Sequence, residues 1–258
     1  MCFNVKYLTQ KLTKYAERKG NSEQEIIEIT KRLGELSDEI NPTFYTNAFT
    51  HPRLLTFTKL SPTQPNLISW GLIPGWTKDQ KQALQLQNQT LNARGETIFE
   101  KPSFKESAKK KRCLIMLDGY YEYYHLNKKV YPYLIQHKDQ SPMVLGGLWD
   151  EWEDEQKKVM KTVSIVTTKA NALTAPIHNN PKIKEPRMPL ILNKQQQEKW
   201  LYEESEEQIK KMILPYSAND LEAFTVAPLQ GKSAYGNHPN ACQPYSYEEL
   251  IWKDQQLF

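Results

Sequence analysis

The feature that most constrains the fold is a series of strand-like runs between residues 112 and 168. These runs read RCLIMLDGYYEYYH, YPYLIQHK, PMVLGGLWDEW and VSIVTT, and short turn-forming stretches separate them. β-branched and aromatic side chains are enriched in strands, and strands that follow each other through short turns pair antiparallel. We therefore predict a mostly antiparallel β-sheet or barrel core.

The flanking regions contain helical and strand-like patterns. Residues 5–40 alternate apolar and charged positions in a helical rhythm, and Asn21-Ser22 marks a break, so a helical hairpin is predicted there. Residues 41–76 indicate strands and turns, and residues 78–91 indicate a surface helix. Residues 194–214 predict one charged amphipathic helix, and a last strand is predicted around residues 224–229. The inward-facing residues of the first region are predicted to be Val5, Leu8, Leu12, Tyr15, Ile26, Ile27, Ile29 and Leu33.

No repeat or low-complexity tract divides the 258 residues, so we predict one α+β domain over 1–258 with peripheral helices. A mean hydropathy of −0.71 and the lack of a long apolar segment indicate a cytoplasmic protein that does not bind membranes. Three scattered cysteines form no disulfide or zinc pattern, and we expect no metal and no cofactor. The net charge of +4 permits a polyanionic partner without requiring one.

Cys2 becomes a 1,2-aminothiol once Met1 is removed, as is usual when the second residue is small. Its amine and thiol have ordinary pKa values of about 8 and about 8.5, so both are partly nucleophilic near neutral pH. The amine can form a Schiff base with an aldehyde, and the thiol can then close a thiazolidine ring. Alternatively, the thiolate alone attacks a carbonyl. An isolated Met-Cys start is more often without function, so further residues must support either chemistry.

Four ordered segments supply that support. They are WGLIPGW at 70–76, LNARGET at 91–97, RCLIMLDGYYEYYH at 112–125, and IH at 177–178 with RMPLIL at 187–192. Together with Cys2 they resemble the SRAP family, the SOS-response-associated peptidases or abasic-site processing proteins. That family begins Met-Cys and carries N-A-R-x-E-T, R-C-x-x-P-x-x-G-[FWY]-Y-E-W, and T-x-x-A-N followed by x-H-x-R-M-P. The resemblance runs from Cys2 to about Leu192.

The resemblance implies an SRAP-like fold and covalent capture of abasic sites in single-stranded DNA during the DNA damage (SOS) response. By resemblance, Cys2 forms the thiazolidine crosslink, Asn92 orients the amine or the sugar, and Glu122 is the acid and base. His178 assists Schiff-base formation or stabilises the deoxyribose hydroxyl. Abasic-site lyase activity can accompany the Schiff base. A monomer is expected, associated with the nucleoid when it is bound to DNA.

Glu122 stands among tyrosines, and their desolvation would raise its pKa, which suits proton transfer. Without the motif, a strand-surface carboxylate and a loop histidine would be the better interpretations of Glu122 and His178.

DNA contacts are expected from four further residues. Arg94 and Arg187 are candidate phosphate clamps, because a guanidinium fork matches phosphate oxygens. Trp70 and Trp76 are candidates for base stacking. Core packing is the alternative for both tryptophans, and it is as probable as stacking for Trp70. The charged run 105–112 is a solvated face or a DNA contact.

Three departures from the family pattern stand out. Cys2-Phe3-Asn4 replaces Cys-Gly-Arg, a helical hairpin is inserted at about 8–40, and the segment from His178 to Arg187 is longer. Lys182 and Lys184 in that longer segment are candidate replacements for lost phosphate contacts.

Two other functions stay open at this point. One is a thiol (auto)peptidase, a hydrolase in which Cys2 removes Met1 or cleaves other peptides. The other is a single-stranded nucleic-acid binding module without covalent chemistry, whose affinity would fall steeply with salt.

Overall fold

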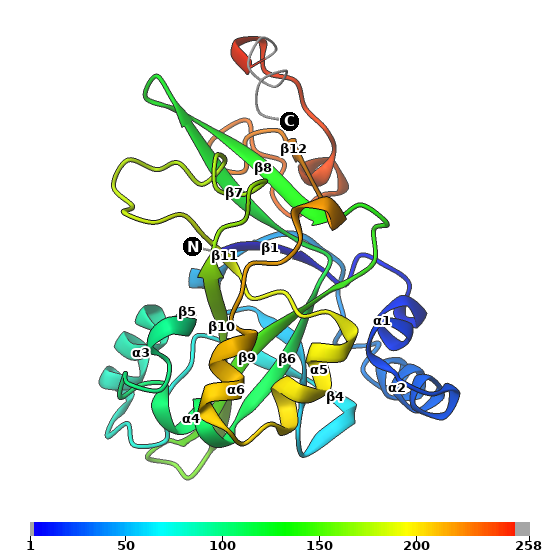
Figure 1. Ribbon diagram of the computed structural model, residues 1–258, viewed down its shortest axis with the longest axis vertical. Helices are drawn as coiled ribbons and strands as arrows, with labels where there is room; N and C mark the ends of the chain where they lie inside the picture. The colour runs from blue at the N-terminus through cyan, green and yellow to red at the C-terminus, as the bar shows by residue number, and fades with distance from the viewer. Residues whose placement is uncertain (1–2, 251–258) are drawn as a thin grey trace.

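The structure is a computed structural model that describes residues 3–250, and its strands form two sheets (Figure 1). The first sheet has five strands in the order β12-β8-β7-β1-β2, and every neighbouring pair is antiparallel. In Figure 1, β7 and β8 rise away from the second sheet as a long hairpin. The strands are β1 (Asn4–Tyr7), β2 (Thr43–Asn47), β7 (Gly119–Leu126), β8 (Lys129–His137) and β12 (Leu221–Thr225).

The second sheet closes into a five-stranded barrel. Its strands follow the order β10-β4-β3-β6-β9, and β9 also pairs with β10, which completes the ring. Two short strands, β5 (Asn92–Arg94) and β11 (Arg187–Pro189), add to β10. The pairs β4–β10 and β5–β10 are parallel and the other pairs are antiparallel, which confirms the predicted α+β fold with a mostly antiparallel core. The barrel strands are β3 (Arg53–Thr58), β4 (Ser61–Trp70), β6 (Arg112–Leu117), β9 (Met143–Glu153) and β10 (Val159–Lys169).

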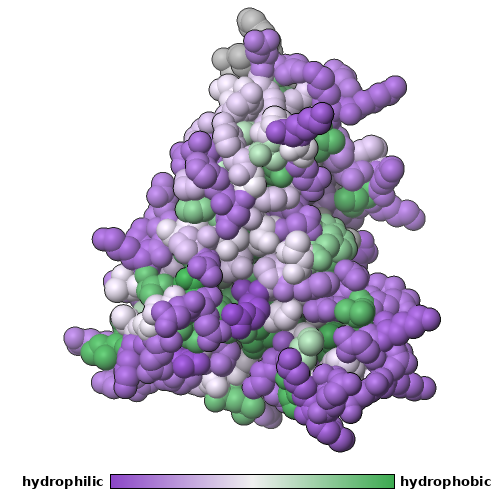
Figure 2. Space-filling view, turned by 180° about the vertical axis from the view of Figure 1, so that it is seen from behind, coloured by the Kyte–Doolittle hydropathy of each residue, from purple (hydrophilic) through white to green (hydrophobic). Residues whose placement is uncertain are grey.

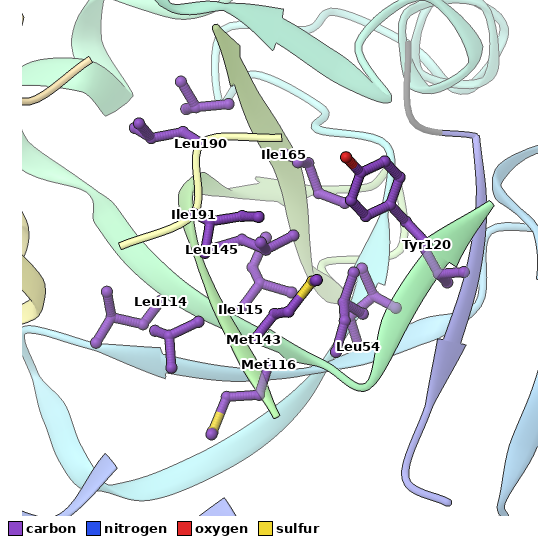
Figure 3. Close-up of a cluster of buried hydrophobic side chains, with 14 of the residues drawn as sticks. Leu54, Leu114, Ile115, Met116, Tyr120, Met143, Leu145, Ile165, Leu190 and Ile191 are labelled. Atoms are coloured by element: carbon purple, nitrogen blue, oxygen red, sulfur yellow. The ribbon is translucent and has the colours of Figure 1, made fainter. Parts of the chain in front are cut away.

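Apolar side chains fill the barrel and cover its outer wall (Figure 3). Every residue of β6 is buried, because the barrel interior covers one face and helix α5 (Lys194–Tyr202) packs near the other. Trp200 of α5 donates its indole N–H to the carbonyl of Cys113, at 3.1 Å. A Cβ atom at Gly146 would lie 2.9 Å from Leu190 Cδ2 and 3.1 Å from the Trp200 ring, so a side chain at this position in β9 would crowd both neighbours. Strands buried on both faces therefore lose the apolar–polar alternation of a one-sided sheet.

The predicted helical hairpin consists of α1 (Leu12–Lys19) and α2 (Glu23–Glu35). The Ser22 hydroxyl caps α2 by accepting from the Glu25 N–H at 3.2 Å. Tyr15 fixes the hairpin to the barrel, because its buried hydroxyl donates to Asp118 at 2.5 Å.

Two details of the predicted hairpin were wrong. The helical rhythm assigned from residue 5 onward begins only at Leu12, and Val5 is instead buried in β1 between β7 and β2. Ile27 was expected to face inward but is 56% exposed, whereas Ile29 and Leu33 form the buried face of α2.

The other helices lie around the barrel (Figure 1). The predicted surface helix is α3 (Gln80–Gln89), and the charged run forms the short α4 (Lys105–Lys110). The single helix predicted for 194–214 is wrong: α5 ends at Tyr202, and α6 (Glu206–Met212) begins after the Ser205 cap. No helix within residues 3–250 is long and apolar enough to cross a membrane. Figure 2 shows a largely polar face with separate apolar patches.

Candidate active site

Glu122 and His178 are distant in sequence but lie together in the fold. Glu122 is on β7, opposite Tyr133 of β8, and His178 follows the turn that Asn171 closes after β10. The Asn171 carboxamide oxygen accepts from the Thr174 N–H at 2.9 Å, and the Thr174 carbonyl accepts from the His178 N–H at 2.9 Å. These bonds bring His178 Nδ1 to 3.3 Å from Glu122 Oε2. We call these two residues the Glu122–His178 pair.

Burial sets the protonation of the Glu122–His178 pair. Glu122 is 6% exposed, and desolvation raises its pKa from 4.5 to about 7, although the Tyr123 backbone N–H, which donates to the carboxylate at 3.2 Å, opposes part of this. Desolvation lowers the pKa of His178 to about 4, and the positive charge of Arg187 adds to this effect. At neutral pH the pair is therefore a neutral imidazole beside a carboxyl group near half protonation, not an ion pair. Such a carboxyl group both donates and accepts protons.

Arg187 orients the imidazole through its backbone. His178 Nδ1 lies 2.9 Å from the Arg187 carbonyl oxygen and 3.2 Å from its backbone nitrogen. The lengthened segment between the two residues therefore keeps them in contact.

The Arg187 guanidinium does not face solvent as a phosphate clamp would. It is 1% exposed and donates to Glu96 at 2.6 Å, to Glu185 at 3.1 Å and to the carbonyl of Thr167 at 2.8 Å. In this structure its donors point to protein acceptors and hold the loop in place.

A cavity of about 330 Å³ opens beside the Glu122–His178 pair. Its size suits a small ligand. Phe3, the residue that directly follows Cys2, is part of its wall. Cys2 itself lies outside the described residues. Among residues 3–250, its lining consists of Phe3, Asn4, Glu122, Tyr123, His125, Val130, His178, Asn180, Ile183 and Gln230.

The remaining predicted site residues occupy different surroundings. Asn92 is half-buried at the start of β5, opposite Ile165 of β10, and is not among the described residues that line the cavity. Arg94 is exposed at the end of the same strand. Trp76 is 48% exposed, whereas Trp70 is completely buried and donates its indole N–H to the Leu91 carbonyl at 2.7 Å. Trp70 therefore belongs to the core, the alternative that the sequence left open.

Two structural contributors to the site were not found from the sequence. The Asn179 side chain donates to the His125 carbonyl at 2.9 Å and accepts from its N–H at 2.6 Å, which fixes the loop after His178 to β7. Asn4 accepts from the Tyr45 hydroxyl and from Asn47, each at 3.2 Å, and so braces the wall beside Phe3. An Asn in a loop or strand carries no pattern that reveals such a partner.

Comparison with known protein families shows to which family this chain belongs. The family model described as SOS response associated peptidase (SRAP) matches residues 1–233. The chain belongs to the SRAP family. Its relatives include the abasic site processing protein YoqW of Bacillus subtilis, 35% identical over 165 residues that cover 63% of this chain and 69% of YoqW. The abasic site processing protein HMCES of Rattus norvegicus is 28% identical over 205 residues, which are 68% of this chain and 55% of the rat protein.

A solved structure supports the SRAP fold. The crystal structure of a protein from Bacteroides thetaiotaomicron matches with a TM-score of 0.80 at 33% identity. The match covers 95% of this chain and all of that chain, so the first sheet and the barrel are both included.

Proposed function

We propose that this SRAP protein processes abasic sites in single-stranded DNA by capturing the sugar aldehyde covalently on Cys2. The observation that carries the proposal is the Glu122–His178 pair in a cavity whose wall includes Phe3, one peptide unit from Cys2. Consecutive Cα atoms are about 3.8 Å apart, and we infer from this short link to Phe3 that the Cys2 aminothiol reacts at this cavity. The abasic site processing relatives provide independent support for the substrate.

The chemistry begins at the ring-opened sugar. The Cys2 amine attacks the C1′ aldehyde and forms a C–N bond and a hydroxyl group. The protonated Glu122 carboxyl gives its proton to this hydroxyl, which leaves as water, and a protonated imine remains. The Cys2 sulfur then adds to the imine carbon and closes the thiazolidine, while the thiol proton returns to the Glu122 carboxylate. The net reaction joins aldehyde and aminothiol and releases one water.

Lyase activity at the 3′ side branches from the imine. The imine acidifies C2′, and ionised Glu122 accepts the C2′ proton while the 3′ C–O bond breaks and the phosphate leaves. A carboxyl group with a pKa of about 7 is available in both forms for these two steps. We infer that the neutral His178 imidazole hydrogen-bonds the sugar hydroxyl, and that Asn92 on β5 orients the amine or the sugar. The exposed Arg94 and Trp76 are proposed to contact the phosphate backbone and a base.

A crosslinking assay tests the proposal. Mature protein is incubated with uracil-excised single-stranded DNA, and heat-stable adducts are separated on a denaturing gel. Wild type forms a slowly migrating adduct, Cys2→Ala forms none, and Glu122→Gln forms it about 100-fold more slowly, in the range for loss of a general acid. Cys242→Ser is the matched control and should crosslink like wild type. The absence of an adduct with wild type, or equal crosslinking by Cys2→Ala, overturns the proposal.

The family description favours one second candidate, a peptidase in which the Cys2 thiolate attacks an amide. Self-processing predicts that protein made without methionine aminopeptidase loses Met1 by itself. Mass spectrometry of that protein decides the point, because persistent Met1 contradicts self-processing.

A further inference from the structure

An exposed aromatic pair stands at the mouth of the candidate site. The rings of Phe3 and Phe49 are stacked, with centroids 5.5 Å apart and an interplanar angle of 29°. Phe3 belongs to the cavity wall, and Phe49 is 54% exposed. One face of the Phe49 ring lies on Phe3, so a ligand can stack on its other face. Single exposed apolar residues are common on protein surfaces and need no explanation. A stacked pair that continues the wall of a cavity is not such an isolated residue, and it indicates a binding surface.

Hydrogen bonds hold the backbone of the turn that carries Phe49 beside Phe3. It lies in the short 3₁₀ turn Ala48–Thr50, whose Ala48 N–H donates to the Phe3 carbonyl at 2.7 Å. The Phe49 N–H donates to the Asn47 side chain at 2.9 Å, and that side chain donates to Asn4 at 3.2 Å. The turn is thus tied to Phe3 and to Asn4 at the start of β1, and stacking on Phe49 costs little conformational entropy.

The surroundings suit a nucleic acid. Residues 47–52 read NAFTHP and contain no acidic side chain that would repel a phosphate. Every base has a π-face, so stacking on an aromatic ring is favourable for any base. A phenyl ring also has no polar atom that would need a partner when a base covers it.

We propose that Phe49, backed by Phe3, stacks on the base next to the abasic residue and positions the DNA strand at the cavity. This inference rests on the proposed function, since it takes the abasic strand as the ligand. Because only one ring face is accessible, a base on one side of the abasic site is stacked and the base on the other side is not. Phe49 is a positioning residue and takes no part in bond formation.

Binding without chemistry tests the inference. The ligand is single-stranded DNA with a tetrahydrofuran spacer, which lacks the aldehyde, and with fluorescent 2-aminopurine immediately 5′ or 3′ of it. Wild type is expected to quench 2-aminopurine on one side only. Phe49→Ala is expected to bind about tenfold more weakly, within the range for loss of one stacked base, and to abolish the quenching. Phe49→Trp should restore both.

Leu60→Ala is the matched control, because Leu60 is 80% exposed at the β3–β4 turn, beside the barrel and not in the cavity wall. It should bind and quench like wild type. Thermal unfolding shows whether Phe49→Ala folds normally, which its exposure leads us to expect. Wild type that does not bind or quench, or Phe49→Ala that still quenches, overturns the inference. Quenching without any aldehyde adduct overturns the proposed covalent function instead, so the two failures are distinguishable.

Discussion

Replacing Glu122 by Gln should stabilise the protein at alkaline pH while it impairs the proposed chemistry. The folded protein holds the Glu122 carboxyl with a pKa of about 7 instead of 4.5, because burial disfavours the charge. When folding raises the pKa of a carboxyl group, that group does not reduce the stability of the protein at pH values below its ordinary pKa. Stability is then lost as the pH rises from about 4.5 to about 7, since the unfolded chain releases its proton first.

The size of the effect follows from the two pKa values. Each pKa unit corresponds to about 1.4 kcal/mol, so full ionisation of Glu122 costs the fold about 3 kcal/mol. Glu122→Gln removes this cost, because the amide has a similar shape and no charge. The variant should therefore exceed wild type by about 3 kcal/mol at pH 8 and by less than about 1 kcal/mol at pH 5.

Urea unfolding at pH 5, 6, 7 and 8 measures the difference. Contributions of other titrating groups away from the site, such as the buried His137, are common to both proteins and cancel when the two curves are subtracted. Glu155→Gln, in an exposed turn, is the control and should show no such trend. If Glu122→Gln is no more stable than wild type at pH 8, burial does not hold the carboxyl in the state that we describe.

Three further outcomes are expected. Tyr15→Phe removes a donor to the buried Asp118 carboxyl and should lower the free energy of unfolding by about 1.5–3 kcal/mol in a urea titration; a loss below about 0.5 kcal/mol would mean that this bond does not anchor the hairpin. Asn179→Ala removes both hydrogen bonds to His125, so hydrogen exchange should accelerate in residues 179–186, with Tm nearly unchanged; unaltered exchange would refute the clamp. Burial raises the pKa of the Cys113 thiol, so an alkylating reagent should modify Cys113 only in urea, as mapped by mass spectrometry; labelling of the native protein would contradict this.

The sequence predicted the central strands well, and the reason is local. Between residues 112 and 168, β-branched and aromatic runs coincide with the observed strands, and Ser22 caps the second helix where a polar break indicated one. Barrel closure was harder, because the β4–β10 pair joins residues about 90 positions apart and parallel strands need no local turn signal. Val5 was placed in a helix because four residues are too few to separate a period of two from a period of 3.6.

The site was predictable only in part. The ordered motifs identified Glu122 and His178 as candidate site residues, and in the structure the two side chains are in contact. The burial of Arg187 depends on Glu96, distant in sequence, and on Glu185. An arginine that pairs with protein carboxylates and an arginine that binds phosphate can have the same neighbours in the sequence, so only the fold distinguishes the two. Trp70 and Trp76 show the same limit, since one is in the core and the other at the surface.

The placement of β1 has a consequence for engineering the chain's start. Both edges of β1 are paired, with β7 on one side and β2 on the other, so the strand cannot slide without breaking its ladder. One residue inserted before Asn4 would leave the register of β1 unchanged and lengthen the chain ahead of it by one residue, which spans at most about 3.6 Å. The number of residues ahead of β1 therefore sets how far the start of the chain can reach, and we expect crosslinking to depend on that number as well as on the identity of Cys2. Affinity tags and fusions belong at the other end.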